Sequence, residues 1–363
     1  MFVTDATRLP LLMVCNGSRN MAASYPVVVG DNTVRDEGNA AHYMAQAVFN
    51  REFNIEELTE RKAPNGVYMT PEMAEHVQWY LDGIQRGNFD GVEVETSYGN
   101  EQWRINSRAD HIASFENGHL YIDEFKYGWR IVEPENNWTM IWHAIGYCIT
   151  RQIQPAQIMF TVHQPRPWHP EGKRRSHTIT YQQLLSLYGQ IQTTLANPTD
   201  ALQTGWHCAS CHALATCPTA RKAEMNALDM AELTTFADDI PDAELSFTVD
   251  QLRRAQSIIN SRLEASEELI MHRLRNGRVV DNYAIEPTQS NRKWKTHINA
   301  MIIQALTGKD IAIAKLPTPK QAEKLIGVDM VANLSERIPT GSKLVRISAD
   351  KRAKRLLGAK QED

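Results

Sequence analysis

The 363-residue chain is 42% hydrophobic and 23% charged, which excludes a mainly disordered or fibrous protein and, at this length, predicts more than one domain. No run approaches the roughly 20 apolar residues of a membrane-spanning helix, so no membrane partner is expected. The formal net charge of −4 means that any nucleic-acid binding depends on local basic patches rather than on bulk charge.

The first 220 residues predict an α/β fold, because helical and strand-like patterns alternate along them. Thr70 followed by Pro71 is typical of a helix start, with the threonine as N-cap. The turn-like run Glu116-Asn117-Gly118 joins two alternating segments and predicts three consecutive antiparallel strands. In chain order, the pattern predicts helices over 36–50 and 71–86, strands over 92–96, 103–114 and 119–127, a helix over 137–149, a strand over 157–162 and a helix over 180–195.

Beyond residue 220 the pattern becomes mostly helical and rich in charge. It predicts helices over 228–236, 248–275, 296–307 and 319–326, with a short hairpin over 279–285 and a basic tail. We therefore place a domain boundary near residue 222. It separates an α/β core at 1–222 from a mostly helical accessory region at 223–363.

Two adjacent predicted strands carry the residues that suggest chemistry. Alternation places Glu124 and Lys126 on one face of their strand and Asp123 on the other. The turn before this strand brings Asp110 alongside, so that Asp110 and Glu124 can converge on one divalent cation, with magnesium or manganese the best match for such oxygen ligands. With a lysine beside them, this set suits phosphodiester hydrolysis. The alternative is an exposed cross-strand charge pair.

The order of these residues resembles the PD-(D/E)XK nuclease superfamily, whose core is an acidic residue followed by (D/E)-x-K. Here those positions are Asp110 and Glu124-Phe125-Lys126. The run Gly38 to His42 resembles the upstream histidine element of the RecB-like branch, and His143-x3-Tyr147 stands where that branch has Gln-x3-Tyr.

The resemblance implies a restriction-endonuclease-like core, a mixed sheet flanked by helices. It also implies a role for each matching residue. The implied metal ligands are His42, Asp110, Glu124 and the backbone carbonyl of Phe125; Lys126 positions the attacking water, Tyr147 supports Lys126 or a DNA phosphate, and His143, in place of glutamine, contacts DNA.

Three of the five cysteines lie close together, as Cys208-x2-Cys211-x5-Cys217. This triple resembles that of RecB-like nucleases with a [4Fe–4S] cluster, in which a fourth cysteine lies far upstream, as Cys15 does here. The alternative is a zinc site in a structural adaptor, formed by the triple with Cys15, His207 or His212. Cys148 is expected to be a buried core thiol.

The wider resemblance is to a phage and prophage family of RecB-like nucleases. It covers nearly the whole chain, including Cys15-x-Gly-Ser, Gln164-Pro165-Arg166, Ser290 to Trp294 and Gln321 to Gly327. It implies a phage-encoded DNA exonuclease of the recombination type that acts in the cytoplasm of a bacterial host. DNA is the implied partner, with a phage single-strand annealing protein as a candidate second partner. The rival hypothesis is a catalytically silent DNA-binding or assembly protein that keeps the nuclease fold.

Basic residues gather at three places that could contact DNA. In two of them an aromatic residue lies nearby and could stack on a base. The alternative in each case is a solvated charged face. The three groups are Lys173-Arg174-Arg175, Arg292-Lys293-Trp294, and the tail residues Lys351, Arg352, Lys354 and Arg355.

Overall fold

The structure is a computed structural model that describes residues 1–23, 33–232, 241–289, 293–295, 298–307, 318–337 and 339–347. Backbone contacts divide the chain into two compact units, Met1–Ser266 and Glu267–Asp363. The boundary near residue 222 that the sequence suggests lies within the first unit. None of the described helices is both long enough and apolar enough to cross a membrane.

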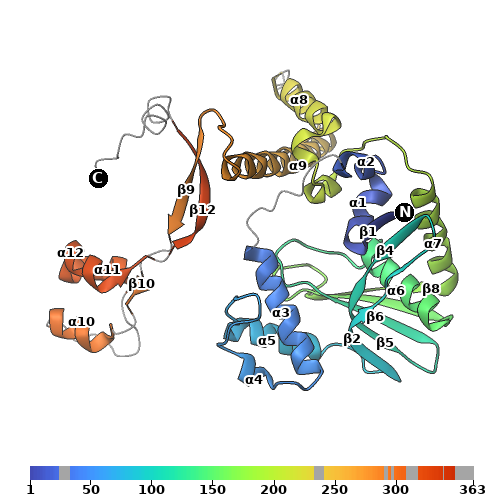
Figure 1. Ribbon diagram of the computed structural model, residues 1–363, viewed down its shortest axis with the longest axis horizontal. Coiled ribbons are helices and arrows are strands. Elements are labelled where there is room, and N and C mark those ends of the chain that lie inside the picture. Colours follow the sequence, from blue (N-terminus) through green and yellow to red (C-terminus); the bar gives the residue numbers. More distant parts are fainter. Residues whose placement is uncertain are drawn as a thin grey trace. The chain divides into compact units, whose positions relative to one another are not determined.

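A mixed five-stranded sheet is the centre of the first unit (Figure 1). In spatial order its strands are β2 (Phe89–Glu95), β5 (Arg108–Ser114), β6 (His119–Phe125), β7 (Gln157–His163) and β8 (Arg174–Thr180). The predicted turn joins β5 and β6, which pair antiparallel, and Gly118 takes a left-handed φ of 80° that glycine tolerates. β6 and β7 run parallel, so the chain between them must cross over, and it does so through a helix.

The predicted strand over 103–114 is in fact two strands, which belong to different sheets. The alternating run 103–114 is not continuous, because Ser107 is buried and its N–H donates to Ser97 Oγ at 2.8 Å. The residues after Ser107 enter the main sheet as β5, whereas those before it pair elsewhere. The small sheet has the order β1 (Phe2–Asp5), β4 (Trp103–Asn106) and β3 (Tyr98–Gly99).

The four helices predicted between residues 36 and 195 are confirmed. Each of the three caps Thr70, Asn137 and Thr180 accepts a hydrogen bond, from Met73, Met140 and Gln183 N–H groups respectively. The four helices are α3 (Thr33–Phe49), α5 (Pro71–Leu81), α6 (Trp138–Arg151) and α7 (Tyr181–Ala196), and the short helix α4 (Ile55–Leu58) was not predicted. The mixed α/β architecture predicted from the sequence is therefore present.

Two apolar layers cover the two faces of the main sheet. Ile122 of β6 belongs to a core with residues of α6 and α7, whereas Phe125 of the same strand packs with residues of α3 and α5. Alternation along β6 thus places Glu124 on the face covered by α6. Asp123 faces the other layer, where it accepts from His111 and His163 at 2.8 Å.

The first residues of the chain are tied to the end of the core. Asn16 donates to the carbonyl of Thr194 at 3.1 Å, and Gly17 N–H donates to the carbonyl of Ala201 at 3.1 Å. The remaining elements of this part are the 3-10 turns Ala6–Arg8, Trp206–Ser210 and Leu214–Thr216 and the helices α1 (Leu9–Val14), α2 (Ser18–Ala23), α8 (Pro218–Glu232) and α9 (Asp242–Arg275).

The second unit shows that the predicted hairpin over 279–285 is wrong. β9 (Tyr283–Gln289) pairs antiparallel with β12 (Pro339–Arg346), more than 50 positions later in the sequence. Residues 233–236 of one predicted helix and the basic tail lie outside the described residues. The other elements are β10 (Lys293–Trp294), β11 (Ser335–Glu336), α10 (Ala300–Thr307), α11 (Pro319–Ile326) and α12 (Val328–Leu334).

Candidate active site

Asp110 and Glu124 lie on neighbouring antiparallel strands, as the sequence predicts. The register pairs His111 with Asp123, which places Asp110 beside Glu124. The N–H of Phe125 donates to Asp110 Oδ2 at 2.8 Å and orients that carboxylate. The Phe125 backbone, expected to supply a carbonyl to a metal, also hydrogen-bonds His42.

Lys126 forms an ion pair with Glu124 through Oε1. Burial opposes the charge on Lys126, but Glu124 and Asp110 outweigh it and raise the pKa of the amine above its usual value. Lys126 is therefore a cation at neutral pH and acts as a hydrogen-bond donor rather than a base.

His143 lies inside the site rather than on a DNA-facing surface, which corrects the expectation that it contacts DNA. Its side chain on α6 is 4% exposed. Nδ1 lies 2.8 Å from Ser107 Oγ and 3.2 Å from Thr96 Oγ1, and Nε2 lies 3.6 Å from Glu124 Oε2. Because the two hydroxyls can donate to Nδ1, the geometry favours the proton on Nε2, directed at Glu124.

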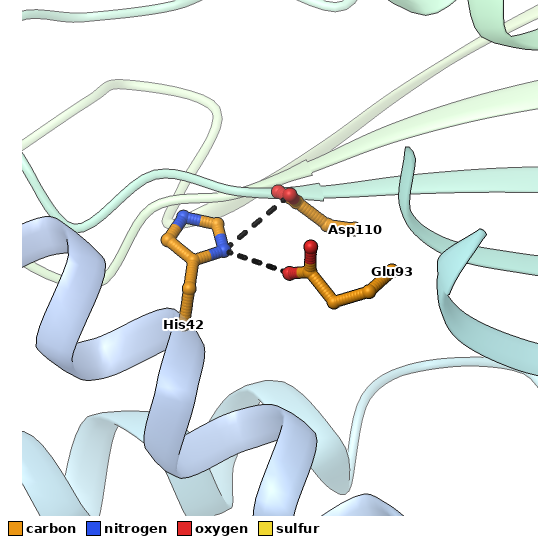
Figure 2. Close-up of side chains that lie close together, drawn as sticks. All are labelled: His42, Glu93 and Asp110. Atoms are coloured by element: carbon orange, nitrogen blue, oxygen red, sulfur yellow. Dashed lines mark ion pairs between the residues drawn. The ribbon is translucent and has the colours of Figure 1, made fainter. Parts of the chain in front are cut away.

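His42 meets a second carboxylate that sequence analysis did not identify (Figure 2). Its Nδ1 lies 3.4 Å from Asp110 Oδ1 and 3.9 Å from Glu93 Oε1. Within the described parts of the chain, these three residues are the one group whose candidate ligand atoms all lie within 4.8 Å of one another. The sequence pattern places Glu93 in the predicted strand 92–96. No neighbouring residue in the sequence indicates that this strand brings Glu93 close to Asp110.

The carboxyl groups of the site influence one another's ionisation. Burial and the neighbouring Glu124 raise the pKa of Asp110 to about 7. Burial and Asp110 likewise raise the pKa of Glu93. Burial resists the ionisation of Glu124, yet Lys126 and His143 hold its pKa well below the usual range. Burial and Lys126 lower the pKa of His42, which favours the neutral imidazole that metals bind.

Most of these side chains, though not Glu93, line one open cavity of about 450 Å³. It lies where the main sheet, the small sheet and two helices meet. Among the predicted site residues, its lining includes His42, Asp110, Glu124, Lys126 and His143. The site therefore gathers donors of the kinds that hold a divalent cation, with a charged lysine beside them.

Tyr147 does not line this cavity. Its hydroxyl lies 3.4 Å from Ser114 Oγ, and its ring packs against Phe89 with centroids 5.6 Å apart. It lies one turn of α6 beyond His143, so the shared helix face does not bring both residues to the same group. The predicted contact of Tyr147 with Lys126 is absent from the described contacts.

The four predicted cluster cysteines come together despite their separation in sequence. Cys15, Cys208, Cys211 and Cys217 all line one small pocket, and none of them forms a disulfide. Cys148, on α6, instead lies in the core at 4% exposure, as expected.

The predicted basic groups have different environments. Arg175 is buried and donates to the carbonyl of Val132 at 2.7 Å and to Gln164 Oε1 at 2.9 Å, so the DNA-binding role predicted for it is wrong. Arg174 donates to His163 Nδ1 at 3.1 Å, while Lys173 is exposed. Arg292 and the side chain of Lys293 lie outside the described residues, and Trp294 is half-buried.

Comparison with known proteins gives a family but no activity. Residues 12–353 match the family described as "Protein of unknown function (DUF2800)". No curated protein matches the sequence.

Two solved structures are weakly similar. SSO0001 is 16% identical, with 56% of this chain and 94% of that chain covered and a TM-score of 0.24. A candidate exonuclease from Eubacterium rectale is 8% identical, with 65% and 94% covered and a TM-score of 0.27. At TM-scores below 0.5, neither similarity bears on the fold or function of this chain.

Proposed function

We propose that this chain, which belongs to the DUF2800 family of proteins of unknown function, is a metal-dependent nuclease that hydrolyses phosphodiester bonds in DNA. The observation that carries the proposal is the cavity itself. It brings His42, Asp110, Glu124 and Lys126, from one helix and two strands, to a single place.

The donors fit magnesium or manganese. Carboxylate oxygens dominate the set, which suits these hard cations, and a single imidazole is compatible with both. Glu124 Oε2 is buried and has no hydrogen-bond partner, although an unsatisfied buried carboxylate oxygen is costly. A divalent cation held here by Asp110, Glu124 and His42 would polarise a phosphate and lower the pKa of a water.

The protein's own groups have distinct tasks in this proposal. Asp110 is held by the backbone of Phe125, and Glu124 by Lys126, so both carboxylates are oriented before any ligand arrives. Lys126 donates a hydrogen bond that orients the attacking water or the phosphate. His143 keeps Glu124 aligned.

DNA is the proposed substrate, and degradation from ends in phage recombination is the proposed context. Arg108, whose side chain is 63% exposed, borders the cavity and can meet a phosphate. The preference for ends and a phage annealing protein as a second partner come from the family resemblance in the motifs.

A [4Fe–4S] cluster is the proposed occupant of the cysteine pocket. Burial and the neighbouring cysteines raise the pKa values of the Cys208 and Cys211 thiols. A bound metal is therefore needed to hold these two sulfurs as thiolates. A tetrahedral zinc site with Zn–S bonds of about 2.3 Å would bring its sulfurs to roughly 3.8 Å from one another. In the described chain no three of the sulfurs lie within 4.8 Å of one another, which favours a larger, multi-iron group.

The test is digestion of end-labelled linear duplex and covalently closed circular DNA with magnesium, manganese or EDTA. We expect the linear duplex to be degraded with either metal, the circles to resist, and EDTA to stop the reaction. Asp110→Asn and Glu124→Gln should abolish cleavage while DNA binding survives. Glu116→Gln, on the exposed turn of the same hairpin, is the matched control and should cleave normally.

Each contrary result has a definite meaning. Equal attack on circles would make the protein an endonuclease. Near-native cleavage by Asp110→Asn would overturn the site. DNA binding without metal-dependent cleavage by the wild-type protein would identify a silent DNA-binding protein.

A further inference from the structure

Glu93 faces Asp110 from the neighbouring strand in a backbone conformation that extended strands do not use. The antiparallel register pairs Val92 with His111 and Val94 with Ala109, so Glu93 lies across from Asp110. Its φ of 53° falls in the left-handed region, which residues other than glycine rarely adopt. The register of β2 with β5 continues without a shift on both sides of Glu93, so this conformation is confined to the one residue that faces Asp110.

The three candidate ligand atoms have spacings that suit one cation. His42 Nδ1 lies 3.4 Å from Asp110 Oδ1 and 3.9 Å from Glu93 Oε1, and the three residues each offer one ligand atom within 4.8 Å of those of the other two. Around an octahedral cation with bonds of about 2.1 Å, ligand atoms lie roughly 3 to 4.2 Å apart. Only small adjustments would bring the three atoms onto such a sphere.

Each carboxylate is already oriented through its other oxygen. Asp110 Oδ2 accepts from the Phe125 N–H at 2.8 Å. Glu93 Oε2 accepts from Arg108 Nε at 2.9 Å. Asp110 and Glu93 each therefore turn one oxygen, Oδ1 and Oε1, toward His42 (Figure 2).

An independent feature of the cavity that His42 and Asp110 line also points to a cation. Glu124 is 4% exposed, and its Oε2 has no hydrogen-bond partner among the described residues. Glu124 and Asp110 line the same cavity. The nearest printed partner of this oxygen is His143 Nε2, which at 3.6 Å is too far for a hydrogen bond. A buried carboxylate oxygen without a hydrogen bond, close to a histidine–carboxylate group, is the arrangement that a bound cation would complete.

We infer that Glu93 is a ligand of the divalent cation, together with His42 and Asp110. The inference rests on the proposed metal-dependent function and assigns to that cation a residue that no motif identified. The cation class is that of Mg²⁺ and Mn²⁺, because two of the three donors are carboxylate oxygens.

The experiment measures Mn²⁺ binding to the full chain by titration calorimetry. Glu93→Gln removes the negative charge but keeps the size, and we expect the dissociation constant for Mn²⁺ to rise about tenfold or more. Glu95→Gln is the matched control, because Glu95 is on the same strand and borders the same cavity but lies outside the three-residue group. Its Mn²⁺ affinity should stay within about twofold of the wild type. Mn²⁺ binding by Glu93→Gln at wild-type strength would overturn the inference.

Arg108→Gln tests whether Glu93 acts only through its ion pair. This variant leaves Glu93 in place and should bind Mn²⁺ within about threefold of the wild type. An equal loss in Arg108→Gln and Glu93→Gln would overturn the inference. If Glu93→Gln does not fold, Glu93→Asp replaces it; the shorter side chain should also weaken Mn²⁺ binding, and unchanged binding would contradict the assignment.

The outcomes separate this inference from the proposed function. A wild-type protein that binds no Mn²⁺ and cleaves no DNA overturns both. A wild-type protein that binds Mn²⁺ and cleaves DNA, with Glu93→Gln unchanged in Mn²⁺ affinity, overturns only the role of Glu93.

Discussion

His143 directs its imidazole at Glu124, with 3.6 Å between Nε2 and Oε2, while Ser107 and Thr96 fix the other ring nitrogen. A histidine held in this way orients the carboxylate without occupying the place of the substrate.

The first prediction follows from this contact. His143→Ala should lower kcat by about 10- to 100-fold and leave KM for DNA unchanged, because the alignment of Glu124 is lost and no DNA contact is removed. His143→Gln should recover part of kcat, since its amide N–H can also be directed at Glu124. A rise in KM with unchanged kcat would show instead that His143 contacts DNA.

Lys126→Ala should be inactive but still bind Mn²⁺. The lysine is a charged donor beside Glu124 and not a metal ligand, so its loss removes the orientation of the water or phosphate but keeps the donors of the cation. The measurement is a Mn²⁺ titration alongside cleavage of linear duplex. Loss of Mn²⁺ binding in Lys126→Ala would contradict this assignment.

The cysteine pocket predicts a structural cluster. Cys15→Ser and Cys217→Ser should give colourless, poorly soluble protein, because each removes one of the four sulfurs that line the pocket. Cys148→Ser should keep the cluster. Iron and sulfide content after anaerobic purification, read with the visible absorbance, decides between the outcomes. One zinc per chain and no iron would replace the cluster with a zinc site.

Cys148 supplies a prediction about pH. Burial raises the pKa of its thiol to about 12, whereas a thiol in the unfolded chain ionises near pH 8.5. The unfolded chain therefore loses this proton first, and Cys148 makes stability fall as the pH rises from about 8.5 towards 12. At pH 8 the folded protein should resist alkylation at Cys148, whereas urea should make the thiol reactive. Mass spectrometry after brief iodoacetamide treatment measures both, and rapid modification of folded protein would disprove burial.

Gly146 predicts a clear packing effect. A Cβ at this position would lie 2.0 Å from the carbonyl oxygen of Thr96, a residue whose hydroxyl contacts His143. Gly146→Ala should therefore cost about 1–3 kcal/mol or more of unfolding free energy. Gly189→Ala in α7 is the control, since no atom lies within 4 Å of its added Cβ, and it should be neutral or stabilising by up to about 1 kcal/mol. Thermal unfolding of both variants provides the comparison; equal stability would show that α6 can shift.

The elements that the sequence predicted well are those specified by neighbouring residues. The cap at Thr70 and the turn at Gly118 each depend on a few adjacent positions, and both are present. The Glu124–Lys126 face follows from the two-residue period of a strand. These features need no knowledge of distant contacts.

The features that sequence analysis missed depend on partners far away in the chain. β9 pairs with β12, and Arg175 donates hydrogen bonds to Val132 and Gln164. Glu93 reaches the site through a left-handed backbone that its residue type does not suggest. Such contacts are decided by tertiary packing rather than by local pattern.

The contacts of Asn16 and Gly17 with Thr194 and Ala201 have a consequence for synthesis of the protein. At about 5–20 residues per second, the ribosome needs on the order of 10–40 s to add the residues that separate these partners. During that time the apolar side chains of α1 have no completed core to enter. The nascent chain therefore exposes an apolar N-terminal segment of the kind that chaperones bind. The core can form completely only after the residues up to about Ala201 have left the ribosome.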